Sequence, residues 1–457
     1  MRRTSAGALL QSSSSIIFSP TLNRSGADSG GVFGASRVFA NAPLLDDIRC
    51  FTLSAALDYI FESENIVAKA VTTANTEAWV VTFDNYSIGH GFNRKGFGED
   101  FFIENGVSAI HVMGKREDWY QYEEINHALA AVKEYVSSAD RVMAYGSSMG
   151  GYAAIRFAEK CGAHIALAIS PQYSIDPKKV PFEKRWLSDS RRIRFLRKVD
   201  GPIRSNIQTI IVYDPLSQDK HHVSLIKKEI DALCLALPFT GHPATTFLSE
   251  IGLLKELVFS AIQGNLDARQ FKLKAREARS HSSLYYTTAS ERFLQRDIKK
   301  AVHFAKLAVG ANPHSPLAYL SLALAQARSG AMNEALVASE RMVEISNKDT
   351  NFLIHRANVL IQADQHEAAL QIAKEVLADP NSQTMAHLHA WLAIFAKRNG
   401  DEDLYEKCMA SARSLDPNEP RYRAPHSNNI RRALTFLRQT INVNRRRLLR
   451  LSKFWRY

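Results

Sequence analysis

The segment 141–158 constrains the fold more than any other part of the chain. It reads RVMAYGSSMGGYAAIRFA, in which an apolar run of strand type leads through glycines and serines into a helix-forming stretch. Gly146 and Gly150 flank Ser148 and, without side chains, permit a tight turn between a strand and a helix. Such a turn would hold the Ser148 hydroxyl above the carboxyl edge of a sheet and aim the amide of Met149 at a developing oxyanion. The pattern therefore predicts a nucleophile elbow, the strand–turn–helix that presents a reactive serine.

Strands and helices alternate on both sides of this turn. Strand-like apolar runs lie at 65–71, 78–83, 109–113, 141–145, 164–169, 208–213 and 234–237, and amphipathic helices are predicted over 44–61 and 122–137. The alternation predicts an α/β fold with one doubly wound, mainly parallel sheet. The segment 175–207, which is basic and contains three prolines, interrupts it and is either a lid or a solvated surface excursion.

A reactive serine requires a base, and the base requires an acid that fixes its tautomer. His242 follows the last strand-like run, and Asp219 lies a few residues beyond the run before it. Because the carboxyl ends of parallel strands meet at one edge, Ser148, Asp219 and His242 are expected to lie together. Asp214 is the alternative acid, although it could instead cap its loop by bonding nearby amides.

Position alone predicts the rest of this site. The loop after 78–83 is expected to supply a second oxyanion amide from Asp84, Asn85 or Tyr86. His90, Trp119 and Tyr120 are candidates to line the pocket, with a core or surface role at least as probable for each. His221 and His222 are better explained by surface exposure. The sequence has no Walker A motif, no HExxH and no dinucleotide fingerprint, so we expect no metal and no cofactor.

The second half of the chain has a period of 34 residues. Alanines recur at this spacing in two sets, twelve residues apart: Ala289, Ala323 and Ala357, then Ala301, Ala335 and Ala369. Small residues permit close contact between paired helices, and the period is that of the tetratricopeptide repeat. The segment that begins at Gly400 completes a degenerate fourth unit. Such arrays present a concave surface, so a protein partner is expected.

The positive charge of the chain is concentrated at its end. The formal net charge is +12, and residues 421–457 hold ten arginines and one lysine without any acid. The remainder is close to neutral, which gives no reason to expect nucleic acid as a partner. Apolar residues at a three-four spacing predict a basic amphipathic helix or tail over 418–457. It would cap the repeat array, with attachment to an anionic surface as an added role.

Three features of the sequence bear on the cellular location of the protein: the leader, the cysteines and the hydropathy. Residues 1–43 are rich in serine, glycine and alanine, and we expect a disordered leader, although a transit peptide would have a similar composition. The four cysteines are far apart, which favours a reducing compartment, and no apolar run reaches the length of a membrane span. A cytoplasmic protein is expected, with peripheral membrane association through the basic tail.

Together these motifs resemble known families. Residues 44–265 resemble an α/β-hydrolase of the serine-triad type, and residues 282–417 resemble a tetratricopeptide array. With Phe97-Gly98, Asp118-Trp119-Tyr120 and the final Gly241-His242, the chain is similar to bacterial hydrolases that carry repeats, some of which accompany surface-polysaccharide genes. The order of Ser148, Asp219 and His242 predicts a metal-independent serine hydrolase, an esterase or deacylase, and an ester-type small molecule or a saccharide is expected as its substrate. The resemblance itself does not identify the substrate. Two alternatives stay open: an inactive hydrolase-like assembly protein, and an acyltransferase in surface-polysaccharide modification.

Overall fold

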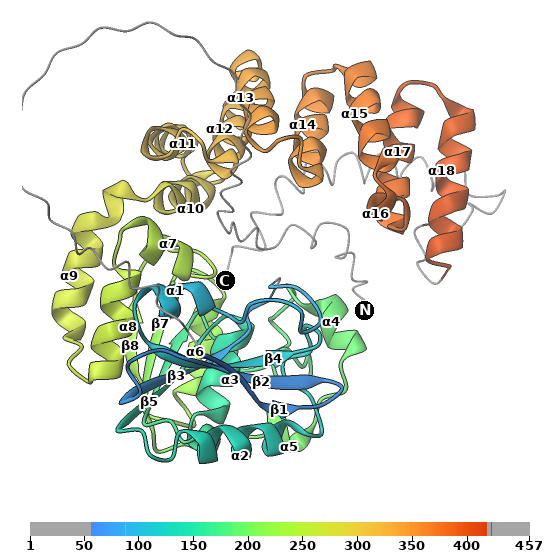
Figure 1. The fold of residues 1–457 in the computed structure, drawn as a ribbon. Coiled ribbons are helices and arrows are strands. Elements are labelled where there is room, and N and C mark those ends of the chain that lie inside the picture. Colours follow the sequence, from blue (N-terminus) through green and yellow to red (C-terminus); the bar gives the residue numbers. More distant parts are fainter. Residues whose placement is uncertain (1–55, 87, 418–421, 423–457) are drawn as a thin grey trace, which may run out of the picture.

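A computed structural model describes residues 56–86, 88–417 and 422 of the chain (Figure 1). The predicted leader and, apart from Tyr422, the basic tail lie outside the described residues, so the cap and the anionic surface stay predictions. Within the described ranges, every helix is too short or too polar to cross a membrane. The predicted bounds of the parts, 44–265 and 282–417, also stay predictions.

The first half of the described chain forms an eight-stranded sheet. Its strands are β1 (Ala56–Glu62), β2 (Ile66–Thr72), β3 (Ala78–Phe83), β4 (Ser108–Gly114), β5 (Arg141–Ser147), β6 (Ile165–Ile169), β7 (Gln208–Tyr213) and β8 (Leu233–Ala236). They lie in the order β1-β2-β4-β3-β5-β6-β7-β8, with β2 antiparallel to both of its neighbours and every other adjacent pair parallel. This confirms the predicted α/β class with one mainly parallel sheet.

Helices cover both faces of the sheet. They are α1 (Glu99–Glu104), α2 (Ile125–Tyr135), α3 (Met149–Phe157), α4 (Leu187–Arg192), α5 (Arg197–Asp200), α6 (Asp219–Ile226), α7 (Thr245–Glu250) and α8 (Leu254–Gln263), followed by α9 (Ala268–Ala278). Successive side chains of β3 point to opposite faces of the sheet. Val81 and Phe83 pack in the core under α2 and α3, whereas Val80 packs in the core under α8. Burial on both faces explains why the central strands are continuous apolar runs.

The helix predicted over 44–61 is wrong in its described part. Residues from Ala56 form β1, which pairs with β2 across a turn where the Ser63 amide donates to the Ile66 carbonyl. Leu57 and Tyr59 are 56% and 52% exposed, as an edge strand permits. A strand that buries so little side-chain surface shows no clear alternation, so the spacing of its apolar residues was misread as helical.

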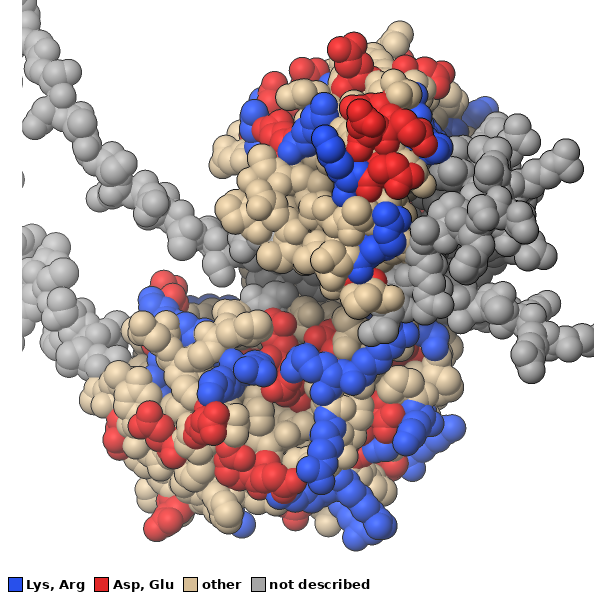
Figure 2. All heavy atoms as spheres, turned by 90° about the vertical axis from the view of Figure 1, so that its right-hand side faces the viewer, with Lys and Arg blue, Asp and Glu red and all other residues tan. Residues whose placement is uncertain are grey.

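The segment 175–207 carries α4 and α5 and has a basic outer surface. Its exposed lysines and arginines are Lys178, Lys179, Arg191, Arg192, Arg194, Arg197, Lys198 and Arg204. Basic side chains gather on the sheet-bearing part of the molecule, on the side where α4 lies (Figure 2). The segment is also anchored inward, because Glu183 and Trp186 are 3% and 2% exposed. It is therefore more than a solvated excursion.

The second half is an array of paired helices. These are α10 (Ser283–Phe293), α11 (Ile298–Ala311), α12 (Pro316–Ser329), α13 (Met332–Ile345), α14 (Thr350–Gln362), α15 (His366–Ala378), α16 (Pro380–Gln383), α17 (Ala386–Arg398) and α18 (Glu402–Leu415). All six repeating alanines are at most 1% exposed, and Ala323 and Ala335 share one core between α12 and α13. The predicted array of helix pairs is confirmed, with α17 and α18 as its fourth pair and the short α16 between the third and the fourth.

The array begins directly against the sheet-bearing part. The Ser282 hydroxyl and the Leu284 amide both donate to the Glu250 carboxylate at the end of α7. The rings of Phe239 and Tyr285 meet edge to face, with centroids 5.6 Å apart. Polar and aromatic contacts thus join α10 to α7 and to the loop that follows β8.

The buried alanines give the first prediction. Ala335→Leu should destabilise the array by about 1–3 kcal/mol, because three extra carbons cannot fit where α12 and α13 touch. Val337→Leu on the same helix is the control, since Val337 is 68% exposed and the change should stay within about 0.5 kcal/mol. Thermal unfolding followed by circular dichroism measures both, and equal midpoints would contradict the packing described here.

Candidate active site

The chain turns sharply where β5 passes into α3. Ser148 occupies the turn with φ 54° and ψ −113°, in a region that costs a residue with a side chain about 1–3 kcal/mol. Its amide donates to the Ile169 carbonyl of β6 at 2.9 Å. A Cβ atom at Gly146 would lie 2.2 Å from the Gly150 backbone, and one at Gly150 would lie 2.3 Å from the Phe83 carbonyl oxygen. The turn therefore requires glycine at both positions.

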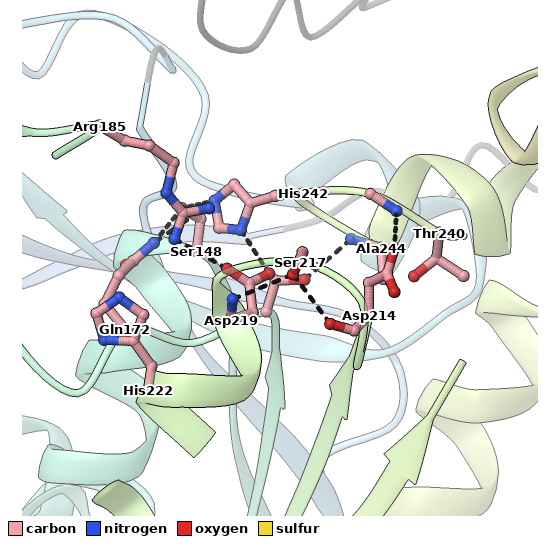
Figure 3. Close-up of polar contacts among 12 residues, drawn as sticks. Ser148, Gln172, Arg185, Asp214, Ser217, Asp219, His222, Thr240, His242 and Ala244 are labelled. Carbon is pink, nitrogen blue, oxygen red and sulfur yellow. Dashed lines mark hydrogen bonds and ion pairs between the residues drawn. The ribbon is translucent and has the colours of Figure 1, made fainter. Parts of the chain in front are cut away.

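Three predicted residues form one chain of hydrogen bonds (Figure 3). Ser148 Oγ lies 2.9 Å from His242 Nε2, and His242 Nδ1 lies 2.8 Å from Asp219 Oδ2. Asp219 opens α6 after β7, and His242 lies in the loop after β8. Asp219 is fully buried and Ser148 is 4% exposed. With the proton on Nδ1, this geometry allows the imidazole to accept the Ser148 proton at Nε2 while the carboxylate orients the ring.

Asp214 contacts the loop of His242 without bonding the ring. One carboxylate oxygen accepts from the Leu216 amide at 2.8 Å, and the other accepts from the Gly241 amide at 3.0 Å. Burial raises the pKa of Asp214, and these amide bonds oppose the shift. Asp214 thus ties the end of β7 to the residue before His242, which is the loop-capping role considered from the sequence.

A buried charge network surrounds Asp219. Arg185 donates to Asp219 Oδ1 at 2.9 Å and to Glu183 at 2.7 Å, so one guanidinium joins two carboxylates. Burial alone would raise the pKa of Asp219, but the charges of His242 and Arg185 outweigh it and lower the pKa to about 2. The pKa of Glu183 is also held well below its usual range, because Arg185 and His222 overcome the effect of burial. Asp219 is therefore held as a carboxylate.

His222 is not on the surface, so that interpretation of the sequence is wrong. Its ring is fully buried, with Nε2 2.9 Å from Glu183 and Nδ1 accepting from the Tyr173 amide at 3.1 Å. Burial lowers the pKa of His222 despite the Glu183 partner. His221, its neighbour, is partly exposed. The error arose because α6 buries one side of each turn, and only the inward side carries His222.

Sequence reasoning missed Gln172, which lies three residues beyond β6. Its side chain is 1% exposed, and Nε2 donates to Ser148 Oγ at 2.9 Å. Figure 3 shows Gln172 approaching Ser148 from the end of the strand next to β5. The available signal was its position, since a polar residue just after a central strand lies at the edge where such sites form.

The predicted oxyanion donors differ in whether their backbone amides already have a hydrogen-bond partner. The Met149 amide opens α3, where a helix leaves amides without intrahelical partners. The Asp84 amide already donates to the Tyr120 hydroxyl at 2.5 Å, and the Asp84 carboxylate binds Arg94. The amide of Asn85 therefore fits the role better than that of Asp84.

Aromatic side chains pack beside His242. The Trp186 ring lies 4.6 Å from Tyr86, 5.5 Å from Trp119 and 6.2 Å from His242 between centroids. The Trp186 indole nitrogen is buried without a hydrogen-bond partner among the described residues. His90, in contrast, is 66% exposed and faces Glu117. Trp119 thus belongs to this wall, and His90 does not.

Comparisons with known proteins show likeness to solved structures alone. No family model matches the sequence, and no curated protein matches it. An α/β-hydrolase enzyme from a Medee basin deep-sea metagenome library is 12% identical over 49% of this chain and 98% of its own, with a TM-score of 0.31. Carboxyl esterase 2 of the fungus Tuber melanosporum is 14% identical over 50% and 86%, with a TM-score of 0.31. A tetratricopeptide protein of Thermus thermophilus is 16% identical over 38% and 94%, with a TM-score of 0.28.

Metal-ligating side chains are not gathered at this site. Within 56–86, 88–417 and 422, no three His, Cys, Asp or Glu side chains are placed to hold a metal ion. The charged groups beside Ser148 are instead paired with one another, as the Arg185 network shows.

The tight turn gives the second prediction. Gly150→Ala should destabilise the protein by about 1–3 kcal/mol or more, because the added methyl would overlap the Phe83 carbonyl. Gly310→Ala in α11 is the control: no atom lies within 4 Å of its Cβ position, so the change should be neutral or stabilising by up to about 1 kcal/mol. Chemical unfolding measures both. Equal effects would show that the turn tolerates a side chain.

The lowered pKa of Asp219 gives the third prediction. A depressed pKa stabilises the fold above the ordinary value of 3.8, and this stabilisation is lost as the pH falls through about 2. Asp219→Asn should therefore lower the free energy of unfolding by about 2 kcal/mol near neutral pH. The difference from wild type should be constant down to about pH 5 and narrow below about pH 4. Urea unfolding across this range measures it, and a difference that widens with acid would contradict the prediction.

Proposed function

We propose that this protein is a serine hydrolase, an esterase or deacylase that needs no metal. The observation that carries the proposal is the continuous hydrogen bonding from Ser148 through His242 to Asp219 at the carboxyl edge of a parallel sheet. The low pKa of Asp219 supports it, because an ionised acid stabilises the imidazolium formed when His242 takes a proton.

The reaction has two stages. Ser148 Oγ attacks the ester carbonyl carbon while its proton passes to His242 Nε2, and the Met149 amide with one from Asn85 or Tyr86 receives the oxyanion. Collapse of the tetrahedral intermediate expels the alcohol, which takes the proton from His242 and leaves an acyl-enzyme. Water then loses a proton to His242 and attacks the acyl group, and the returning proton restores Ser148.

The repeat array supports a second part of the proposal, a protein partner. Paired helices with buried alanines form the stacked units that present a continuous surface to peptides or helices. The substrate is proposed to be an ester-type small molecule or an acylated saccharide. Product analysis in the presence of a sugar acceptor separates hydrolysis from acyl transfer, since transfer would yield an acylated sugar in place of the free acid.

The fourth prediction tests the nucleophile. A fluorophosphonate should label wild-type protein at Ser148, and Ser148→Ala should lose both labelling and turnover of an activated ester while the far-ultraviolet circular dichroism spectrum is unchanged. The turnover of Ser148→Ala should be at least about 10³-fold below that of wild type.

Ser147→Ala is the matched control for this experiment. Ser147 is the adjacent serine, it is as buried as Ser148, and its hydroxyl bonds Thr245 at 2.8 Å rather than His242. It should keep labelling within about threefold of wild type. Folded wild-type protein without label, or label that persists in Ser148→Ala, would refute the proposed nucleophile.

A further inference from the structure

The side chain of Gln172 is held in one orientation at the reacting oxygen. Trp119 Nε1 lies 3.4 Å from Gln172 Oε1, and an indole nitrogen can only donate. The carbonyl end of the amide must therefore face Trp119, which turns the amino end toward Ser148. Trp119 and Gln172 are both 1% exposed, so water does not compete for these positions.

Ser148 Oγ consequently has two hydrogen-bond partners, one that accepts from it and one that donates to it. It donates its proton toward His242 Nε2 at 2.9 Å and accepts a hydrogen bond from Gln172 Nε2 at 2.9 Å. The second hydrogen bond becomes stronger when the oxygen gains negative charge, because a donor to an anionic oxygen is worth about twice a donor to a neutral one. Charge develops on Oγ twice in the proposed reaction, during attack and when Oγ departs from the acyl group.

We propose that Gln172 is a further catalytic residue, whose side-chain amide stabilises the negative charge that develops on Ser148 Oγ. The inference rests on the proposed hydrolase function and adds a donor to the nucleophile itself, separate from the backbone donors to the carbonyl oxygen. The amide gives up no proton: the Ser148 proton still passes to His242 and returns from it. Trp119 is a positioning residue in this arrangement, since it acts through the orientation of Gln172.

The test compares Gln172→Met with wild type. Methionine has a similar length and volume but no donor, so kcat for an activated ester and the rate constant for fluorophosphonate labelling should fall on the order of 10- to 100-fold. KM should change by less than about threefold, because the lost bond matters mainly in the transition state.

Gln121→Met is the matched control. Gln121 is a second glutamine in the same region, and its amide bonds the Trp119 carbonyl and the Tyr152 hydroxyl without reaching Ser148. It should lower the thermal midpoint while labelling stays within about threefold of wild type. An equal loss of labelling in both variants would mean that packing, not the donor, sets the rate, and would overturn the inference.

Gln172→Glu tests the donor through the pH dependence of labelling, which would not change if Gln172 were only structural. A protonated glutamic acid can donate to Ser148 Oγ, whereas the carboxylate can only accept. The rate of labelling relative to wild type should therefore rise as the pH is lowered. Nearby charged or titratable groups include His242, whose Nε2 lies 3.5 Å from Gln172 Nε2, and His222, which accepts from the Tyr173 amide. With Asp219, Arg185 and Glu183, they are present in both proteins, so the ratio of the two rates removes most of their effect.

Trp119→Phe completes the test. It removes the donor that orients Gln172 and should slow labelling several-fold in wild type but add little in the Gln172→Met background. If wild-type Ser148 is labelled and the Gln172 variants react at the wild-type rate, the inference fails and the hydrolase proposal stands. If folded wild-type protein is not labelled at Ser148, both fail together.

Discussion

The close contact between the first turn of α3 and the end of β3 determines most of the site. With no side chain at Gly150, the helix can approach the Phe83 carbonyl to a distance that a Cβ atom would not permit. This approach forces Ser148 into its strained conformation, and the hydrogen bond to Ile169 together with the start of α3 holds it there. The hydroxyl is thereby fixed relative to the ends of β6 and β8, which supply Gln172 and His242. In a looser turn, the Ser148 hydroxyl would not stay within hydrogen-bond distance of both Gln172 and His242.

The buried charges form a second layer that depends on this geometry. A carboxylate as enclosed as Asp219 would take up a proton unless cations faced it, and Arg185 binds one of its oxygens while His242 binds the other. Arg185 is itself held by Glu183, and both come from the segment 175–207. Removal of Arg185 would cost about 3–5 kcal/mol, because two buried carboxylates would lose the cation that they share. The basic segment therefore contributes to the electrostatics of the proposed triad from within, while its outer surface remains solvated.

The sequence was sufficient to predict the elements whose signal is local. The turn at Ser148 and the buried strands each lie within a few neighbouring residues, and the alanine period is a regular spacing along the chain. The structure reproduces all three. Asp219 and His242 could be selected because chain order and strand ends restrict where they lie. Arg185 and Glu183 could not, since each is an ordinary polar residue in a loop until the sheet brings the loops together. For Gln172 the only signal was its place just after a central strand. The strand β1 was mistaken for a helix for a related reason: its pairing with β2, not its own side-chain pattern, determines its conformation.

The repeat array and the proposed site are mechanically connected through one loop. The loop after β8 carries Phe239 and Gly241 immediately before His242, and Phe239 packs against Tyr285 of α10. Gly241 adopts φ 68°, and a Cβ atom there would lie 3.4 Å from the Thr288 side chain of the same helix. On its other side, the Gly241 amide is held by Asp214. The loop that carries His242 thus contacts α10 as well as the sheet, so the first repeat helix helps to support the proposed triad and is not only an appended surface.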